Sequence, residues 1–199
     1  MIPKSRLEPV VHNSLGLSAL CQWLQGKDTW EVLELGPVRR DNIEFWSRYC
    51  NSVYVADLRS SLPLTAMAED SPCPEWADLL RLPEGRRFDI ILAWDLLNYL
   101  QLQDAARLIE YLSPFCRPGT VLFTLIFDQP QMPEAITIYK IVDEQHISYE
   151  YCGLDMRACP RHRPRPLAGA MRRFKTSSSF RLRNGIVEYL FAYEGEGDA

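Results

Sequence analysis

The chain has 199 residues, 47% of them hydrophobic and 24% charged, which is the composition of an ordinary globular domain. No apolar run reaches the roughly 20 residues that a membrane-spanning helix needs. The first residues also lack the apolar stretch of a secretory signal, so we expect a cytoplasmic protein without a membrane segment. The formal net charge of −4 is unevenly spread, because residues 157–183 carry nine of the 22 Lys and Arg and no acid.

The first half of the chain alternates helical and extended patterns. Apolar residues at helical spacing from Leu17 to Leu24 predict an amphipathic helix that Asn13 or Ser14 caps. Four prolines interrupt residues 58–87, where no strand is evident. In chain order, the predicted elements are a helix at 12–26, a strand at 30–35, a helix at 42–50, a strand at 53–56, a short helix at 74–82 and a buried strand at 88–94.

The second half begins in the same way and ends in antiparallel patterns. Asn184-Gly185 between two alternating runs is a strong hairpin signal. The predicted elements are a turn or short helix at 95–100, a helix at 104–116, a strand at 120–127, a strand pair at 136–151, a loop at 157–166, a short helix at 167–174 and the hairpin strands 177–183 and 186–193.

This order predicts one α/β domain over 1–199, because alternating strands and helices form a parallel sheet with crossover helices. We expect 1–28 to be an N-terminal helical segment and 128–175 to be a cap or insert. Ligands of such sheets bind at the carboxyl ends of the strands. Gly36, Asp57 and Asp95 all follow predicted strands and are therefore expected at that edge.

The stretch from Trp30 to Asp57 is typical of a nucleoside site. A strand ends at Gly36, a helix follows, and the next strand ends in Asp57, about 20 residues after the glycine. The glycine lets main chain approach a ligand, and the carboxylate can accept hydrogen bonds from ribose hydroxyls. Asp57 as a helix cap or turn residue is the structural alternative.

These motifs resemble those of the class I S-adenosylmethionine-dependent methyltransferases. Glu34-Leu35-Gly36 matches the start of the family's glycine-rich motif, which is degenerate here because Val38 and Arg40 replace the later glycines. Residues 88–100 resemble the fourth strand and its loop, and 118–128 resemble the fifth strand. The acid that contacts adenine in the family is not evident, although Glu69 or Asp70 could substitute for it.

The resemblance implies a Rossmann-like three-layer α/β/α sandwich, with a mostly parallel sheet closed by an antiparallel C-terminal hairpin. It implies S-adenosylmethionine as cofactor. Glu34 is then a ligand of the cofactor's amino group, or else an ordinary charge at a strand end. The implied cofactor-binding residues are Glu34, Gly36, Pro37, Asp57, Leu58 and Asp95.

Asp95, Asn98 and Tyr99 are the candidate catalytic residues, because they follow the fourth strand, where a methyl acceptor would sit. Asp95 could orient or deprotonate the acceptor, and Tyr99 could stack on it. The alternative is that Asp95 caps a short helix and Tyr99 packs in the core.

No metal site is expected. The six cysteines show no framework spacing and are interpreted as reduced thiols, and the spacing of Cys152, Cys159 and His162 matches no common zinc pattern. Residues 157–183 could bind nucleic acid, but the acidic remainder of the chain favours a solvated arginine-rich loop, with an anionic molecule or an acidic protein still open as partner.

The sequence therefore predicts an S-adenosylmethionine-dependent methyltransferase with an unidentified acceptor. The alternative is a catalytically inactive methyltransferase-like scaffold that contacts an anionic partner through 157–183. A dinucleotide-dependent oxidoreductase is less consistent with the sequence, because a single glycine serves a pyrophosphate poorly.

Overall fold

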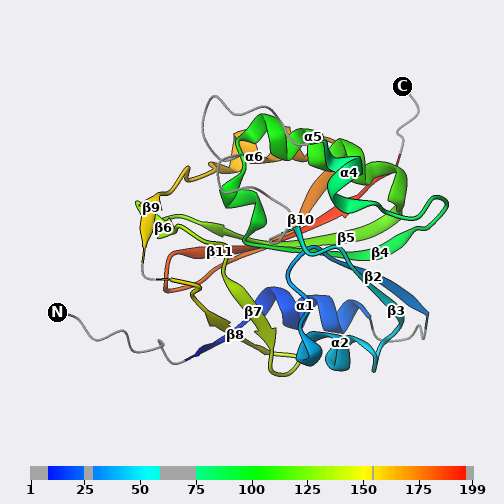
Figure 1. Cartoon of the computed structure of the whole chain (residues 1–199), viewed down its shortest axis with the longest axis horizontal. Helices are drawn as coiled ribbons and strands as arrows, with labels where there is room; N and C mark the ends of the chain where they lie inside the picture. Colours follow the sequence, from blue (N-terminus) through cyan, green and yellow to red (C-terminus); the bar gives the residue numbers. More distant parts are fainter. Residues whose placement is uncertain (1–8, 25–28, 59–74, 154, 196–199) are drawn as a thin grey trace.

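A six-stranded mixed sheet forms the centre of the molecule in the computed structural model, which describes residues 9–24, 29–58, 75–153 and 155–195 (Figure 1). The strand order is β10-β11-β5-β4-β2-β3. The contacts β3/β2, β2/β4 and β4/β5 are parallel, whereas β5/β11 and β11/β10 are antiparallel. The strands span β2 (Trp30–Glu34), β3 (Cys50–Val55), β4 (Phe88–Trp94), β5 (Cys116–Phe127), β10 (Phe174–Arg181) and β11 (Ile186–Tyr193).

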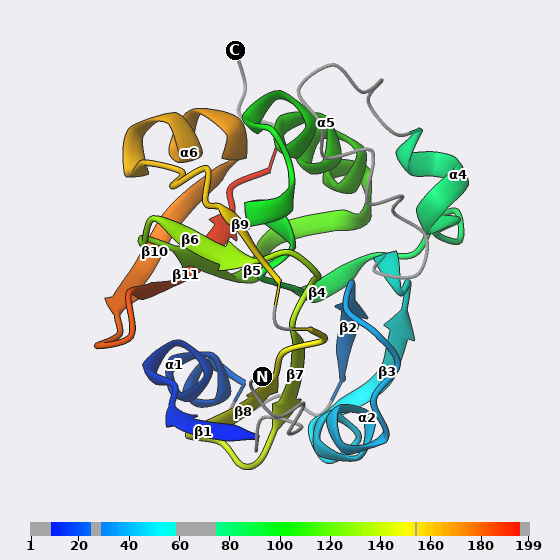
Figure 2. The same cartoon turned by 60° about the vertical axis from the view of Figure 1, so that its left-hand side comes forward.

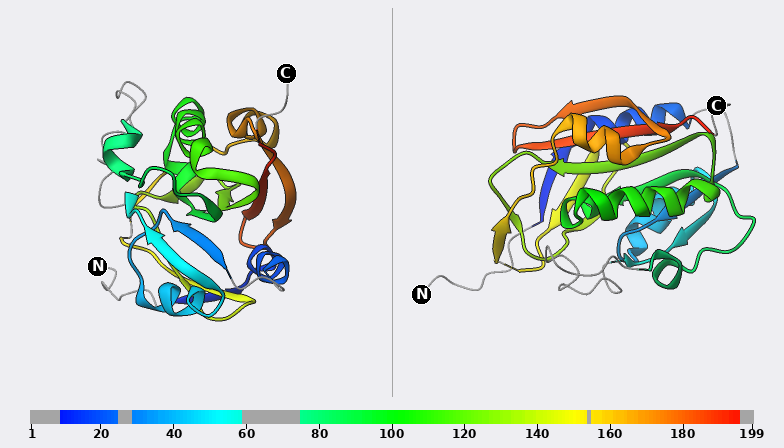
Figure 3. Two further views of the ribbon diagram at one scale, coloured as in Figure 1. Left: turned by 90° about the vertical axis from the view of Figure 1, so that its right-hand side faces the viewer. Right: turned by 90° about the horizontal axis from the view of Figure 1, so that it is seen from above.

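Helices cover both faces of this sheet. α1 and α2 lie on one face, and α4, α5 and α6 lie on the other (Figures 1 and 3). Every residue of β4 is buried, which explains why its sequence is a continuous apolar run rather than an alternating one. The helices span α1 (Leu15–Trp23), α2 (Arg40–Trp46), α4 (Trp76–Leu80), α5 (Leu102–Leu112) and α6 (Pro164–Met171), with 3-10 turns at η2 (Leu96–Tyr99) and η3 (Ser113–Phe115).

A second, antiparallel sheet lies beside α1 and α2 (Figure 2). It consists of β1 (Val10–Asn13), β8 (His146–Glu150) and β7 (Ile138–Ile141) in that order. A further strand pair joins β6 (Gln131–Pro133) to β9 (Met156–Ala158). Segment 128–175 therefore contributes to both sides of the molecule, with β7 and β8 on the α1 side and α6 beside α5 (Figures 1 and 2).

The predicted α/β class is confirmed, and several predicted helix boundaries are wrong. The helix expected from residue 12 begins at Leu15, because Val10–Asn13 pairs with β8 as an extended strand. Ser14 caps the helix as expected, since its Oγ accepts a hydrogen bond from the Leu17 amide. The segment 157–166, expected to be a loop, contains the end of β9 and the start of α6.

α1 packs very closely on the central sheet at Gly16. A Cβ at this position would lie 2.8 Å from the Phe123 ring, so only glycine fits without displacing a buried aromatic side chain. The Gly16 amide donates to the buried Glu188 Oε2 at 2.6 Å, which joins the helix to β11. Burial raises the pKa of Glu188, and the bond from the Gly16 amide opposes this shift.

Asn42 connects α2 to the second sheet and carries a testable prediction. Its Nδ2 donates to the Tyr139 carbonyl at 3.2 Å, and its Oδ1 accepts from the Ile141 amide at 2.8 Å. Asn42→Ala leaves both buried main-chain groups unpaired, so we expect urea denaturation to show a loss of about 1–3 kcal/mol in unfolding free energy. The matched control is Asn51→Ala, at the exposed position of β3, expected within about 0.5 kcal/mol of wild type. Equal losses in the two variants would contradict the role of Asn42.

Candidate functional site

The ends of three parallel strands meet at one edge of the central sheet. The Leu35 amide donates to the Leu92 carbonyl at 3.0 Å, and the Ala56 amide donates to the Glu34 carbonyl at 2.9 Å. The Leu58 amide then donates to the Leu35 carbonyl at 3.1 Å. These main-chain bonds hold the ends of β2, β3 and β4 together, as the sequence predicted for a ligand-binding edge.

Glu34 is the central polar group of this edge. Its side chain is buried, and its Oε1 accepts hydrogen bonds from the Gly36 amide at 2.8 Å and from Trp94 Nε1 at 2.6 Å. Its Oε2 has no hydrogen-bond partner within the described part of the chain. Burial raises the pKa of Glu34 to about 8, although the bonds from Gly36 and Trp94, and the nearby Asn42 amide, oppose this shift. A donor placed against Oε2 would satisfy the remaining oxygen and stabilise the carboxylate.

Trp94 fills the space beside Gly36. A Cβ on Gly36 would lie 2.8 Å from Glu34 Oε1 and 2.9 Å from Trp94 Cδ1. The indole stacks on Tyr139 with a centroid separation of 5.2 Å and an interplanar angle of 4°. Trp94 holds a positive φ of 44°, which costs a non-glycine residue about 1–3 kcal/mol and is tolerated because the ring is fixed on several sides.

The other cofactor-binding candidates surround this centre. Asp57 is half-buried just after β3, and its charge contributes to the raised pKa of Glu34, so the two carboxyl groups lie within electrostatic reach of each other. Leu58 is fully buried, whereas Pro37 is half-buried and Val38 is 61% exposed. Glu69 and Asp70 lie outside the described residues.

Asp95 is completely buried at the end of β4. Its Oδ2 accepts a bond from the Thr137 amide at 3.2 Å and lies 3.5 Å from the Tyr99 hydroxyl. Its Oδ1 has no partner among the described residues. Burial raises the pKa of Asp95 to about 7, so this carboxyl group exchanges its proton near neutral pH. The Tyr99 hydroxyl also donates to the Ala135 carbonyl at 2.8 Å.

The Asn98 side chain forms its hydrogen bonds with main-chain groups. Its Nδ2 donates to the carbonyls of Asp95 at 2.8 Å and Leu125 at 2.7 Å, and its Oδ1 accepts from the Phe127 amide at 2.8 Å. The bonds to Leu125 and Phe127 join η2 to the end of β5, and the bond to the Asp95 carbonyl closes the turn itself. They favour a structural role for Asn98, with Asp95 as the candidate that retains an unused oxygen.

Sequence reasoning missed Trp94, Tyr139 and Thr137, which together cover Glu34 and Asp95. Trp94 carried a weak signal, because it ends an apolar strand directly before a candidate acid. Nothing local in Tyr139 or Thr137 indicated that β7 and the residue before it approach the ends of β2 and β4.

Among the described residues, no group of three or more His, Cys, Asp or Glu is arranged to hold a metal ion. His162 Nε2 instead contacts the carbonyls of Leu97 and Leu100 at 2.9 and 3.1 Å. The helices of the described segments include none with the length and hydropathy to cross a membrane.

No family model matches the sequence, and no curated protein matches it significantly. Solved structures do match. An S-adenosylmethionine-dependent methyltransferase from Clostridium acetobutylicum superposes with a TM-score of 0.56 at 12% identity, over 90% of both chains. The Burkholderia thailandensis 1,6-didemethyltoxoflavin-N1-methyltransferase, solved with bound 1,6-didemethyltoxoflavin and S-adenosylhomocysteine, gives a TM-score of 0.50 at 17% identity, over 92% of this chain and 78% of that one. The glycopeptide N-methyltransferase MtfA, complexed with S-adenosylhomocysteine, gives 0.52 at 13% identity, over 92% of this chain and 90% of that one.

The chain has the class I methyltransferase fold. On this methyltransferase fold, the edge formed by β2, β3 and β4 carries Glu34, Gly36, Asp57 and Asp95, the residues that the sequence singled out. The resemblance inferred from short motifs is thus confirmed at the level of the fold, although identity is too low for a whole-sequence match.

The pKa of Glu34 predicts how stability depends on pH. Because the folded state raises this pKa from its ordinary value of 4.5 to about 8, the folded protein keeps a proton that the unfolded chain releases. Unfolding free energy should therefore fall by a few kcal/mol as pH rises from about 5 to about 8. Glu34→Gln should flatten this slope in urea denaturation, leaving a smaller slope from Asp95. Parallel curves for wild type and variant would contradict the assignment.

Proposed function

We propose that this protein binds S-adenosylmethionine at the carboxyl edge of β2, β3 and β4 and is a methyltransferase whose acceptor is unidentified. The observation that carries the proposal is the buried Glu34 Oε2, which lacks a hydrogen-bond partner within the described residues, at the glycine turn of a methyltransferase fold. A buried carboxyl oxygen without a donor is costly, and a ligand ammonium would remove that cost.

The residues of this edge fit the proposed ligand by chemistry. Glu34 Oε2 would accept from the cofactor's amino group, while Gly36 and Pro37 form the turn that approaches it. Asp57 would accept hydrogen bonds from the ribose hydroxyls, since a carboxylate has two acceptor oxygens. The buried Leu58 would supply an apolar surface, and Asp95 would lie beside the transferred group.

The bound cofactor would supply an electrophilic methyl group, and the chain's own residues would position the acceptor and exclude water. Asp95 has a pKa of about 7 and an Oδ1 without a partner among the described residues, so it is suited to take a proton from an acceptor that arrives protonated. Tyr99 would lie beside Asp95 with its hydroxyl proton donated to the Ala135 carbonyl, and Asn98 would keep η2 attached to β5.

The proposal includes the finer architecture that the family resemblance implies: one domain over 1–199, a three-layer arrangement closed by the β10-β11 hairpin, and 128–175 as a cap. Two contacts support the assignment of 128–175 as a cap, because Tyr139 of β7 stacks on Trp94 and the Thr137 amide binds Asp95. Residues of this segment therefore reach the two groups at which a cofactor and an acceptor would meet.

A second candidate is a methyltransferase-like binding protein without catalysis. One observation favours it: the Trp94 indole occupies the space directly beside Gly36. If that ring remains in place, it excludes a ligand from the glycine turn. Contact with an anionic partner through 157–183 would then be the function.

Calorimetric titration with S-adenosylmethionine and S-adenosylhomocysteine tests the first candidate. We expect saturable binding by wild type and a loss of about 1–3 kcal/mol in Asp57→Ala, from the missing hydrogen bonds to ribose. Asp104→Ala in the first turn of α5 is the matched control and should bind like wild type. Transfer of labelled methyl from the donor to a cell extract, abolished by Asp57→Ala, would establish catalysis. Unchanged affinity in Asp57→Ala would refute the ribose assignment.

Trp94→Phe separates the two candidates. The variant keeps an aromatic ring for Tyr139 but removes the indole Nε1, which would lie 3.2 Å from a Cβ on Gly36. For a methyltransferase, we expect both wild type and variant to bind S-adenosylhomocysteine. Binding by the variant alone would mean that Trp94 closes the site. A folded wild type and variant that both fail to bind would favour the scaffold.

A further inference from the structure

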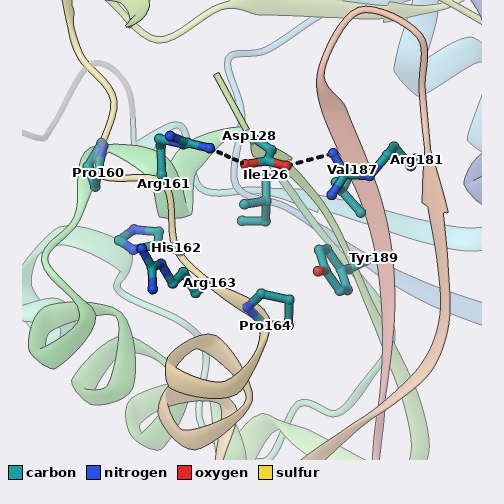
Figure 4. A pocket seen from close by; sticks show the side chains of 10 residues that line it. All are labelled: Ile126, Asp128, Pro160, Arg161, His162, Arg163, Pro164, Arg181, Val187 and Tyr189. Atoms are coloured by element: carbon teal, nitrogen blue, oxygen red, sulfur yellow. Dashed lines mark hydrogen bonds and ion pairs between the residues drawn. The ribbon is translucent and has the colours of Figure 1, made fainter. Parts of the chain in front are cut away.

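A pocket of about 290 Å³ lies beside the antiparallel half of the central sheet (Figure 4). Its walls come from the end of β5, from the segment 160–164, and from the hairpin strands β10 and β11. Because β5, β11 and β10 are neighbours at one side of the strand order while β2 and β3 are at the other, this pocket is separate from the proposed cofactor edge.

Three arginines line this pocket. Arg161 and Arg163 come from the segment before α6, and Arg181 comes from the end of β10 (Figure 4). Arg161 and Arg181 both pair with Asp128, at 3.2 and 2.6 Å. These pairs hold the pKa of Asp128 below its ordinary value, so it stays ionised and orients two guanidinium groups. Each guanidinium retains several N–H donors beyond those used for Asp128.

Arg163 is the cation without a carboxylate partner within 4.0 Å among the described residues, although it lines the same pocket. It also precedes α6, whose prolines 164 and 166 lack amide donors, so the helix end contributes little hydrogen bonding of its own. Arg161 holds a positive φ of 51°, a strained main-chain conformation for a side chain of this size.

The charge of the lining matches a doubly charged anion. Three arginines and one aspartate leave two positive charges, because His162 has a lowered pKa from burial and points its Nε2 at the carbonyls of Leu97 and Leu100. Ile126, Val187 and Tyr189 form an apolar wall beside the cations. A phosphate group on a small apolar or aromatic body combines these two properties.

We propose that this pocket binds a phosphomonoester. The phosphate would lie among Arg161, Arg163 and Arg181, and the organic body would lie against Tyr189. Planar guanidinium groups match phosphate geometry better than point charges do, and Tyr189 is held rigidly by its stacking on Phe191 at 5.2 Å and 12°. This assignment does not depend on methyl transfer, because no residue of the Glu34 edge contributes to it.

Calorimetry at low salt with phenyl phosphate, inorganic phosphate and benzoate tests the proposal. We expect phenyl phosphate to bind saturably, more tightly than inorganic phosphate or benzoate, and more weakly as salt is raised. Arg163→Gln and Arg181→Gln should each weaken binding by about tenfold, the effect of losing one charge-assisted contact.

The matched controls are Arg165→Gln and Arg183→Gln, which make the same change of charge two residues away and outside the pocket lining. We expect both controls to bind like wild type. Absence of saturable binding, or equal weakening of binding in the control variants, would overturn the proposed site. Equal affinity for phenyl phosphate and inorganic phosphate would overturn the role of Tyr189. S-adenosylhomocysteine binding, measured in the same Arg163→Gln sample, separates this result from failure of the proposed methyltransferase site.

Discussion

One buried carboxyl oxygen joins the two strands on which the proposed cofactor site depends. Glu34 Oε1 accepts from the Gly36 amide of its own turn and from the indole of Trp94 at the end of β4. These bonds fix the turn after β2 and hold Trp94 at its positive φ. The other oxygen of the same carboxyl group is left without a donor among the described residues. The Glu34 side chain therefore both orders the turn after β2 and leaves one buried acceptor oxygen without a donor among the described residues.

The segment after β5 determines the surroundings of this carboxyl group. Asn42 attaches β7 to α2, and Tyr139 of β7 then stacks on Trp94. The residue before β7, Thr137, bonds Asp95 through its amide. A change in β7 would thus reach both buried acids at once. On the proposed assignment, β7 would connect the acceptor side of the site to the cofactor side.

The basic residues of segment 157–183 have more than one structural role. Part of it neutralises the protein's own acids, as Arg172 does with Glu110 at 3.5 Å and Lys175 does with Glu194 at 2.6 Å. Another part supplies the arginines of the pocket beside Asp128. The fold therefore uses some of these basic residues in ion pairs with the protein's own acids and places others in the wall of a pocket. A count of charges along the sequence does not distinguish these two uses.

Local sequence patterns were sufficient to predict those elements whose structure is determined by residues close together in the chain. The strand at 88–94 was predicted to the residue, and Gly36 and Asp57 were correctly expected at the ends of neighbouring strands, because a buried parallel strand and its glycine turn have local signatures. Strand β1, the position of Trp94 beside Gly36, the use of Asn98 by main chain and the arginine pocket were decided only by tertiary structure. Each of these features depends on a partner that is distant in the sequence, such as β8, Tyr139, Phe127 or Asp128. The spacing of apolar residues predicts local elements and does not predict contacts between residues far apart in the chain.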